Sequence, residues 1–206
     1  MIAIIDSGIA NLRSAQKAFE RLGPAARIVD DPARLAEASH IVLPGVGAFR
    51  DGIAKVRERG FAEPLAREIA KGKPVLGICL GLHLLFTASE EFGLHAGLDL
   101  LAGRVGRLPD EAPGQARLKI PHMGWNAVRI VREAPILAGI PSGSYFYFVH
   151  SYYPCPADPG IVAGETEYGI PFPSVVWRDN LFATQFHPEK SQAWGLRLLE
   201  NFARLS

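Results

Sequence analysis

The chain has 206 residues, 48% of them hydrophobic, which is enough to bury the core of one domain spanning 1–206. Its 22 basic and 21 acidic residues lack the basic excess of proteins that bind phosphate backbones, so we expect no nucleic acid partner. No segment approaches the run of about 20 apolar residues that spans a bilayer, and M-I-A-I-I ends at Asp6, so we expect a cytoplasmic chain without a membrane segment. Without an export signal, Cys79 and Cys155 are expected to remain free thiols.

Short apolar runs alternate with helical patterns through the first part of the chain. Buried strands are predicted at residues 2–6, 26–29, 40–43 and 74–78. Helices are predicted at 11–22 and 51–71, the second interrupted by Gly60. This spacing predicts parallel strands joined by right-handed crossovers, in a doubly wound, flavodoxin-like α/β fold. Functional loops are then expected at the carboxyl ends of the strands.

Beyond about residue 100 the pattern changes to closely spaced strands. Strands are predicted at residues 117–120, 125–130, 145–149, 161–166, 174–177 and 181–186, with a hairpin turn at 178–180. We therefore expect an antiparallel extension of the mostly parallel sheet. A last helix from about Ser191 is predicted to dock on the core through Trp194, Leu198, Phe202 and Leu205.

The pentapeptide G-I-C-L-G (77–81) lies between a predicted strand and a helix predicted from Leu80 to about Ser89. A nucleophile at such a sharp turn is pushed out of the sheet edge, and the flanking glycines leave room for the turn. The start of a helix favours negative charge, which favours the thiolate form of Cys79. A small buried cysteine between glycines required for packing would have the same pentapeptide, so the choice between a catalytic and a structural cysteine depends on other residues.

A thiolate that attacks an amide needs a base, and the base needs a third group to orient it. The segment Q-F-H-P-E-K (185–190) offers both, because His187 and Glu189 lie two apart at the end of a predicted strand. A loop histidine followed by an acidic residue at a helix start is the simpler interpretation. The order cysteine, histidine, glutamate in one α/β chain favours the catalytic one.

The loop P-G-V-G (44–47) follows directly after the strand predicted at 40–43. Its glycines can present backbone N–H groups without side-chain obstruction. With the Leu80 amide, the backbone of Val46 and Gly47 could then form an oxyanion hole. An ordinary glycine-rich turn explains the tetrapeptide equally well.

Together, P-G-V-G, G-I-C-L-G and H-P-E-K resemble the class I glutamine amidotransferase family, over essentially the whole chain. Finer motifs are similar to those of the glutaminase subunits that serve imidazole glycerol phosphate synthases. These motifs are D-S-G-I-A-N-L-R-S (6–14), P-H-M-G-W-N (121–126), Y-F-V-H-S-Y (147–152) and F-H-P-E-K-S (186–191). Three residues depart from the pattern: Ser7 and Ala10 replace a Tyr and a Gly, and His83 replaces a Gln that helps to hold glutamine.

The resemblance implies that Cys79 is the nucleophile, His187 the general acid and base, and Glu189 its orienting group. It further implies substrate contacts from five residues, Gly47, His83, Glu91, Ser151 and Tyr152. No metal or organic cofactor is implied.

The implied partner is a (β/α)₈-barrel cyclase subunit in a heterodimer, which uses the ammonia from L-glutamine to close an imidazole ring in histidine biosynthesis. The positions that match a partner-facing surface are Asn11, Trp125, Asn126, Tyr147, His150 and Lys190. Core packing is the alternative role for Trp125 and Tyr147.

Three other functions share part of this pattern. A related cysteine hydrolase could carry the same cysteine turn, but P-H-M-G-W-N and the late H-P-E-K are not expected in it. A non-catalytic regulatory subunit would not need all three members of the triad. A glutaminase that feeds another synthase, such as the one that makes pyridoxal phosphate, is the remaining alternative.

Overall fold

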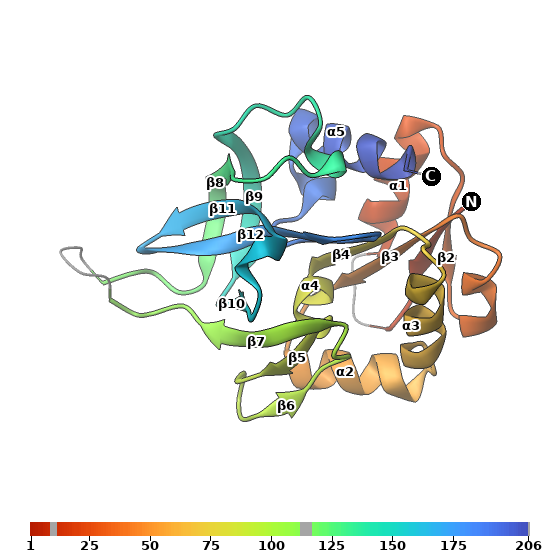
Figure 1. Cartoon of the computed structure of the whole chain (residues 1–206), viewed down its shortest axis with the longest axis horizontal. Helices are drawn as coiled ribbons and strands as arrows, with labels where there is room; N and C mark the ends of the chain where they lie inside the picture. The colour runs from red at the N-terminus through yellow and green to blue at the C-terminus, as the bar shows by residue number, and fades with distance from the viewer. Residues whose placement is uncertain (9–11, 112–116, 206) are drawn as a thin grey trace.

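The computed structural model describes residues 1–8, 12–111 and 117–205, which form a nine-stranded mixed sheet beside a four-stranded one (Figure 1). The strand order of the large sheet is β2-β1-β3-β4-β13-β12-β11-β8-β9. Its first five strands are parallel: β1 (Ile2–Ile5), β2 (Ala26–Val29), β3 (His40–Gly45), β4 (Val75–Cys79) and β13 (Leu181–Thr184). The doubly wound α/β fold with a mostly parallel sheet is confirmed for this half.

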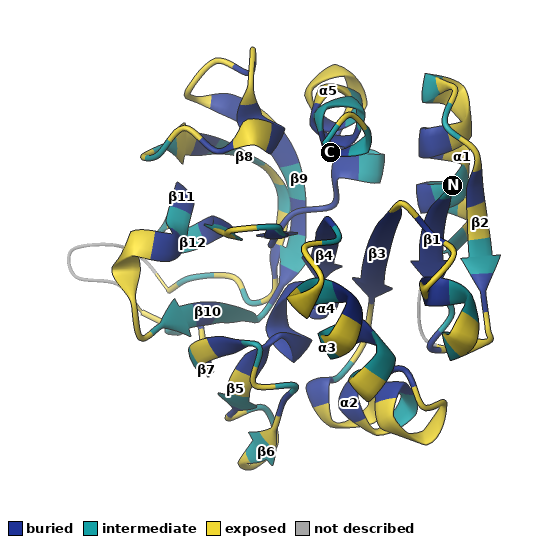
Figure 2. Ribbon diagram, turned by 45° about the vertical axis from the view of Figure 1, so that its right-hand side comes forward, coloured by how far each residue is buried: buried dark blue, intermediate teal, exposed yellow. Residues whose placement is uncertain are grey.

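Helices cover both faces of the parallel strands (Figure 1). Helices α1 (Leu12–Leu22) and α5 (Gln192–Ala203) pack on one face, where Ile2 and Ile4 of β1 meet them. Helices α2 (Phe49–Glu58) and α3 (Ala62–Ala70) pack on the other, against Ala3 and Ile5. Because β1, β3, β4 and β13 are buried on both faces, they are largely apolar runs without alternation. Figure 2 shows β1, β3 and β4 in the colour of buried residues.

The remaining four strands of the large sheet form the predicted antiparallel extension. They are β12 (Ile170–Arg178), β11 (Val162–Tyr168), β8 (His122–Ile130) and β9 (Ser144–His150). The predicted hairpin joins β12 to β13, and Asp179 in its turn has a φ of 53°. The strand predicted at residues 117–120 is wrong, because those residues form an irregular connection into β8.

The smaller sheet was not predicted. It has the order β10-β7-β5-β6, formed by β10 (Tyr152–Pro156), β7 (Leu101–Arg107), β5 (Phe86–Ser89) and β6 (His95–Ala96). The helix expected to reach about Ser89 is therefore wrong in its length, since α4 (Leu80–Leu84) stops after five residues. The chain becomes extended there because β5 pairs with the distant strand β7, a contact that the local apolar pattern does not reveal.

The C-terminal helix docks on the core, but not through all four predicted residues. Leu198 and Phe202 are buried and Leu205 packs against the core as a partly buried residue, whereas Trp194 is 37% exposed. The buried stripe includes Gly195, whose Cβ would lie 1.9 Å from the Pro188 carbonyl oxygen. Four short 3₁₀ turns complete the part of the chain that the structure describes: η1 (Pro32–Leu35), η2 (Pro135–Leu137), η3 (Pro159–Ile161) and η4 (Pro188–Lys190).

Both Cys79 and Cys155 are free thiols, as predicted. Within the described ranges, every helix is too short or too polar to cross a membrane.

Candidate active site

Cys79 occupies a sharp turn between β4 and α4. Its φ of 54° and ψ of −107° lie in a region that residues with a Cβ rarely adopt. The strand ends at Cys79 and the helix begins at Leu80, so the predicted strand-to-helix turn is confirmed. The thiol is almost fully buried and donates a hydrogen bond to the Val149 carbonyl oxygen, with Sγ 3.9 Å from that oxygen.

The two glycines that flank this turn are required because neighbouring atoms lie where a Cβ would be. A Cβ on Gly81 would lie 1.8 Å from the Leu43 carbonyl oxygen of β3. A Cβ on Gly77 would lie 2.9 Å from Leu85 Cδ1 and 3.1 Å from the backbone of Gly81. Both glycines therefore allow α4 to start directly against the sheet, which aims Cys79 into the space beyond the strand ends.

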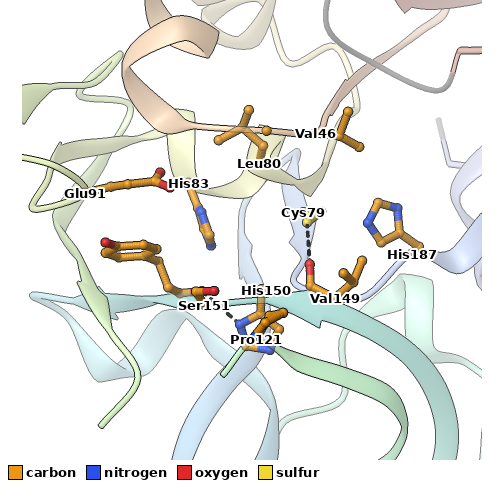
Figure 3. A pocket seen from close by; sticks show the side chains of 12 residues that line it. Val46, Cys79, Leu80, His83, Glu91, Pro121, Val149, His150, Ser151 and His187 are labelled. Atoms are coloured by element: carbon orange, nitrogen blue, oxygen red, sulfur yellow. Dashed lines mark hydrogen bonds between the residues drawn. The ribbon is translucent and has the colours of Figure 1, made fainter. Parts of the chain in front are cut away.

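His187 and Glu189 are hydrogen-bonded to each other at the end of the segment that follows β13. The distance from His187 Nδ1 to Glu189 Oε1 is 2.7 Å, and both side chains are buried. Because a carboxylate oxygen only accepts, Nδ1 carries the hydrogen and Nε2 is left for chemistry. Nε2 has no hydrogen-bond partner among the described residues, and Figure 3 shows the ring beside Cys79.

The electrostatics of His187 favour its protonated form. Burial alone would lower the pKa of His187, but the Cys79 sulfur and the Glu189 carboxylate outweigh burial and raise it to about 10. The sulfur acts through proximity, since no hydrogen bond between Sγ and Nε2 is formed at the observed geometry. An imidazolium beside the thiol is the arrangement that stabilises a thiolate at neutral pH.

Backbone hydrogen bonds tie the His187 segment to β9. The His187 N–H donates to the Tyr147 carbonyl oxygen at 3.0 Å, and the Tyr147 N–H donates to Ser191 Oγ at 3.0 Å. The Ser191 hydroxyl in turn donates to the His187 carbonyl oxygen at 2.6 Å. These bonds fix the position of the histidine relative to strand β9. Ser191 was not predicted as a site residue, although it is the last letter of the motif F-H-P-E-K-S.

A pocket of about 260 Å³ opens above Cys79 (Figure 3). It brings together Cys79 and His187 with every residue predicted to bind substrate or oxyanion, while Glu189 lies behind His187 and outside the lining. The lining residues are Val46, Gly47, Cys79, Leu80, His83, Glu91, Pro121, Val149, His150, Ser151, Tyr152 and His187. Strands β3 and β4 both end at this pocket, as expected for an open α/β sheet.

The P-G-V-G loop runs along the rim of the pocket. A Cβ on Gly45 would lie 2.9 Å from Leu80 Cβ, so this glycine lets the loop pack on the start of α4. Gly47 differs, because it has a φ of 92° and no heavy atom within 4 Å of a Cβ built on it. Gly47 is thus required for its backbone conformation, whereas Gly45 is required for space.

Glu91 places a carboxylate at the end of the pocket away from His187 (Figure 3). Its Oε2 accepts a hydrogen bond from the Phe49 N–H at the start of α2, at 2.7 Å. Burial raises the pKa of Glu91 and the bond from Phe49 lowers it, with a net rise. The carboxylate is therefore held in one place by a helix that the sheet positions.

His83 lines the pocket, but its ring nitrogen is already bonded. His83 Nε2 lies 2.8 Å from Gln185 Oε1, and both side chains are buried. Burial lowers the pKa of His83 to about 4, so the ring is neutral at physiological pH. Gln185 was missed in the sequence, where the available signal was a polar residue inside the apolar run L-F-A-T-Q-F.

A directed chain of hydrogen bonds leads from β8 to the pocket wall. Asn126 Nδ2 donates to His122 Nε2 at 3.2 Å, His122 Nδ1 to His150 Nε2 at 2.9 Å, and His150 Nδ1 to the Tyr152 carbonyl oxygen at 2.9 Å. The carbonyl can only accept, so it determines the tautomer of both rings. Burial lowers the pKa of His150 to about 3 and that of His122 to about 4. His122 was not singled out in the sequence.

The residues predicted to face a partner are spread between surface and interior. Trp125 is 45% exposed and meets Tyr147 edge-on at 6.2 Å between ring centroids, so core packing does not account for it. Asn126, Tyr147 and Lys190 are partly exposed. His150 is only 6% exposed, so its side chain is not part of the exposed surface, and Asn11 lies outside the described residues.

Comparison with known proteins places the chain among glutamine-dependent enzymes. The model of the family described as glutamine amidotransferase class-I matches residues 3–205. The imidazole glycerol phosphate synthase subunit HisH of Syntrophotalea carbinolica is 57% identical over 203 residues, which cover 98% of each chain. The subunit of the same name from Geobacter sulfurreducens is 51% identical over 205 residues, covering 99% of this chain and 98% of that one.

Solved structures share the fold at lower identity. The structure of PurLQS from Thermotoga maritima matches with a TM-score of 0.76 at 18% identity, over 98% of this chain and 96% of that one. A crystal structure described as a glutamine amidotransferase matches with a TM-score of 0.75 at 19% identity, over 98% and 97%.

Proposed function

Because this chain belongs to the class I glutamine amidotransferase family, we propose that it is the glutaminase subunit of an imidazole glycerol phosphate synthase. It hydrolyses L-glutamine to glutamate and ammonia and passes the ammonia to a second subunit. The observation that carries the proposal is the 57% and 51% identity to two subunits of that synthase, over nearly the full length of both chains. That identity favours this synthase over the one that makes pyridoxal phosphate.

The first chemical step is attack of the Cys79 thiolate on the carboxamide carbon of glutamine. The carbonyl π bond breaks as the carbon–sulfur bond forms, and negative charge moves to the amide oxygen. Backbone N–H groups of Leu80 and of the Val46–Gly47 segment, which line the same pocket, stabilise that oxyanion. A donor of this kind contributes on the order of 10²–10³ to turnover.

His187 then carries the proton that the leaving group needs. Its raised pKa supplies a protonated Nε2, which faces the reacting carbon and donates to the departing nitrogen, so that ammonia leaves and a thioester remains. The neutral ring next takes a proton from water, which attacks the thioester and releases glutamate. Glu189 holds Nδ1–H through both halves and keeps Nε2 directed at Cys79.

The rest of the pocket holds the amino acid part of glutamine. The Glu91 carboxylate, fixed by the Phe49 N–H, is the complement to an α-ammonium group. The backbone of Gly47, Ser151 and Tyr152 borders the same space and offers neutral donors and acceptors. These contacts place the carboxamide over Cys79.

The second subunit is proposed to be a (β/α)₈-barrel cyclase, and the complex a cytoplasmic heterodimer. The surface for it is built on β8 and β9, where Trp125, Asn126 and Tyr147 are at least partly exposed. Lys190, which follows Glu189 and is partly exposed, is proposed to extend the same surface. Aromatic residues with one polar neighbour are typical of interface centres.

The test is a glutaminase assay of the purified chain mixed with the cyclase of its own organism. Glutamate release should appear and should be accompanied by a product that requires both subunits. A complex that forms but releases no glutamate would contradict the glutaminase assignment. Equal hydrolysis of ester and peptide substrates would instead favour a general cysteine hydrolase.

A further inference from the structure

Gln185 is buried next to Cys79 and does not line the pocket. It is fully buried at 0% exposure, and it is absent from the pocket lining. Its Nε2 donates a hydrogen bond to Cys79 Sγ at 4.0 Å. A buried amide therefore touches the nucleophile without touching the space where glutamine binds.

The orientation of this amide decides what it does to the sulfur. With Nε2 toward the sulfur, an N–H faces the negative charge of a thiolate. With the amide reversed, the carbonyl oxygen would face the thiolate, and two electron-rich atoms would meet. Only the first orientation favours the reactive form of Cys79.

His83 selects that orientation. Its Nε2 lies 2.8 Å from Gln185 Oε1, and a carbonyl oxygen can only accept, so the ring must carry its hydrogen on Nε2. A ring that donates to Oε1 leaves the amide nitrogen for Cys79. His83 stands 102 positions before Gln185 in the chain and reaches it because α4 starts beside the end of β13.

The sulfur thus has a separate partner for each protonation state. As a thiol it donates to the Val149 carbonyl oxygen at 3.9 Å. As a thiolate it can only accept, and the Gln185 N–H reaches it in addition to the neighbouring His187 imidazolium.

We propose, on the basis of the glutaminase function above, that Gln185 stabilises the Cys79 thiolate and that His83 is the positioning residue that holds its amide. His83 therefore acts on the nucleophile through Gln185 and not by gripping glutamine. Loss of the contact should lower kcat by about tenfold or more, the range of one hydrogen bond to a charged group. The KM for glutamine should change little, because the amide lies outside the pocket.

The experiment compares three variants of the chain in complex with its cyclase. His83→Leu introduces an apolar side chain of similar size and removes the N–H donor. His83→Gln supplies a new N–H and should recover most of the activity that His83→Leu loses. Gln185→Met keeps the length of the side chain and removes the amide. Urea unfolding of each variant checks that it is folded.

The matched control is His40→Leu. His40 is also a buried histidine, and its Nε2 bonds the Leu205 carbonyl oxygen at 3.0 Å, but it lies at the start of β3, away from the pocket. It should leave kcat and KM at their wild-type values. A loss in His40→Leu equal to that in His83→Leu would mean that any buried histidine has this effect, and would overturn the proposal.

The decisive readout is the pH profile of Cys79 alkylation by iodoacetamide, followed on the Cys79 peptide by mass spectrometry. His83→Leu and Gln185→Met should move the midpoint to higher pH, and His83→Gln should move it back. An unchanged midpoint together with an unchanged kcat would overturn the proposal, as would a change in KM alone. If Gln185→Met does not fold, the two His83 variants decide. A wild-type complex that shows no glutaminase activity refutes the proposed function instead, and alkylation still tests the contact.

Discussion

Cys79 has a backbone conformation that a residue with a Cβ keeps only when its surroundings hold it there. Its φ of 54° is enforced by β4 on one side and α4 on the other. Such a residue stores about 1–3 kcal/mol of strain, which the rest of the fold must offset. The strain is useful because the same turn projects the sulfur into the pocket.

Cys79→Ala is expected to abolish glutamine-dependent synthesis while ammonia-dependent synthesis by the cyclase persists. Only the ammonia supply is lost when the nucleophile is removed, and we expect a decrease of at least about 10³-fold in glutamine hydrolysis. The two rates are measured on the same complex with glutamine or an ammonium salt as nitrogen source. Equal loss of both would contradict a role limited to glutamine hydrolysis.

Cys79→Gly should be more stable than Cys79→Ala, by about 1–3 kcal/mol in the free energy of unfolding. Elsewhere in strands and helices the order is reversed, since glycine costs about 0.5–1 kcal/mol relative to alanine. The reversal follows from the positive φ at this turn. Urea titration of the two inactive variants measures it, and an alanine variant as stable as the glycine one would argue against backbone strain.

At the scale of elements, the middle of β9 and the His187 segment are linked by the Ser191 hydroxyl in addition to the backbone bond from His187 to Tyr147. Ser191 accepts from the Tyr147 N–H and donates to the His187 carbonyl oxygen. Tyr147 belongs to the proposed partner surface and His187 to the triad. A displacement of β9 is therefore expected to shift His187 through these hydrogen bonds.

Ser191→Ala is expected to lower kcat by about ten- to hundredfold, because His187 loses a tie that sets its position. Stability should fall by about 1–3 kcal/mol, since the Tyr147 N–H is left without its acceptor. Ser144→Ala is the matched control on the same strand, because the Ser144 hydroxyl bonds only the nearby Pro141 carbonyl oxygen. Steady-state kinetics and urea unfolding are compared for both, and equal losses of kcat would remove the special role of Ser191.

For the whole molecule, buried histidines set the response to acid. The pKa of His83 and His122 in the folded chain is about 4 and that of His150 about 3, against about 6.5 in an unfolded chain. Above pH 6.5 these rings are neutral in both states, and their contribution to stability is fully present. Below pH 6.5 these histidines bind protons in the unfolded chain but not in the folded chain, so the free energy of unfolding falls between about pH 6.5 and pH 4.

His83→Gln should therefore reduce the slope of the free energy of unfolding against pH by up to about 1.4 kcal/mol per pH unit, because the unfolded variant no longer binds a proton at position 83. His187 does not offset the effect, since its raised pKa adds stability that is complete below about pH 6.5 and is lost as pH rises toward 10. The free energy of unfolding is measured in urea at pH 5, 6 and 7, above the range of ordinary carboxylates. Parallel curves for wild type and variant would contradict the expectation.

The complex as a whole is expected to keep glutaminase activity low until the cyclase binds its nucleotide substrate. Ammonia released without an acceptor is wasted, and coupling of two sites needs an element with two arrangements. The P-G-V-G loop is the candidate. One orientation of the peptide next to Val46 aims an N–H at the oxyanion, and the other aims a carbonyl there.

Gly47→Ala should lower the stimulated rate far more than the basal rate, because the positive φ of Gly47 strains alanine while the space around it is open. Gly72→Ala is the control, with a φ of 87° and equally open space in the turn after α3. Glutamine hydrolysis is measured for the chain alone, with cyclase, and with cyclase and its ligand. Equal rates in all three mixtures would refute coupling.

The sequence by itself determined the parallel strands, the cysteine turn, and the pairing of His187 with Glu189. These features depend on local spacing: apolar runs between helical patterns, glycines two positions either side of Cys79, and a separation of two positions between His187 and Glu189. Backbone geometry over a few residues is determined by the steric properties of those residues, so the expectation and the structure agree for these local features.

Only the tertiary structure decided the features that depend on distant partners. Residues 86–89 have a pattern that suits a helix and become β5 because β7 offers backbone hydrogen bonds. The contact between His83 and Gln185 joins positions 102 apart, and that between His122 and His150 joins positions 28 apart. The residues around a polar side chain in the sequence do not identify its hydrogen-bond partner, so its role is known only when the fold brings the two side chains together.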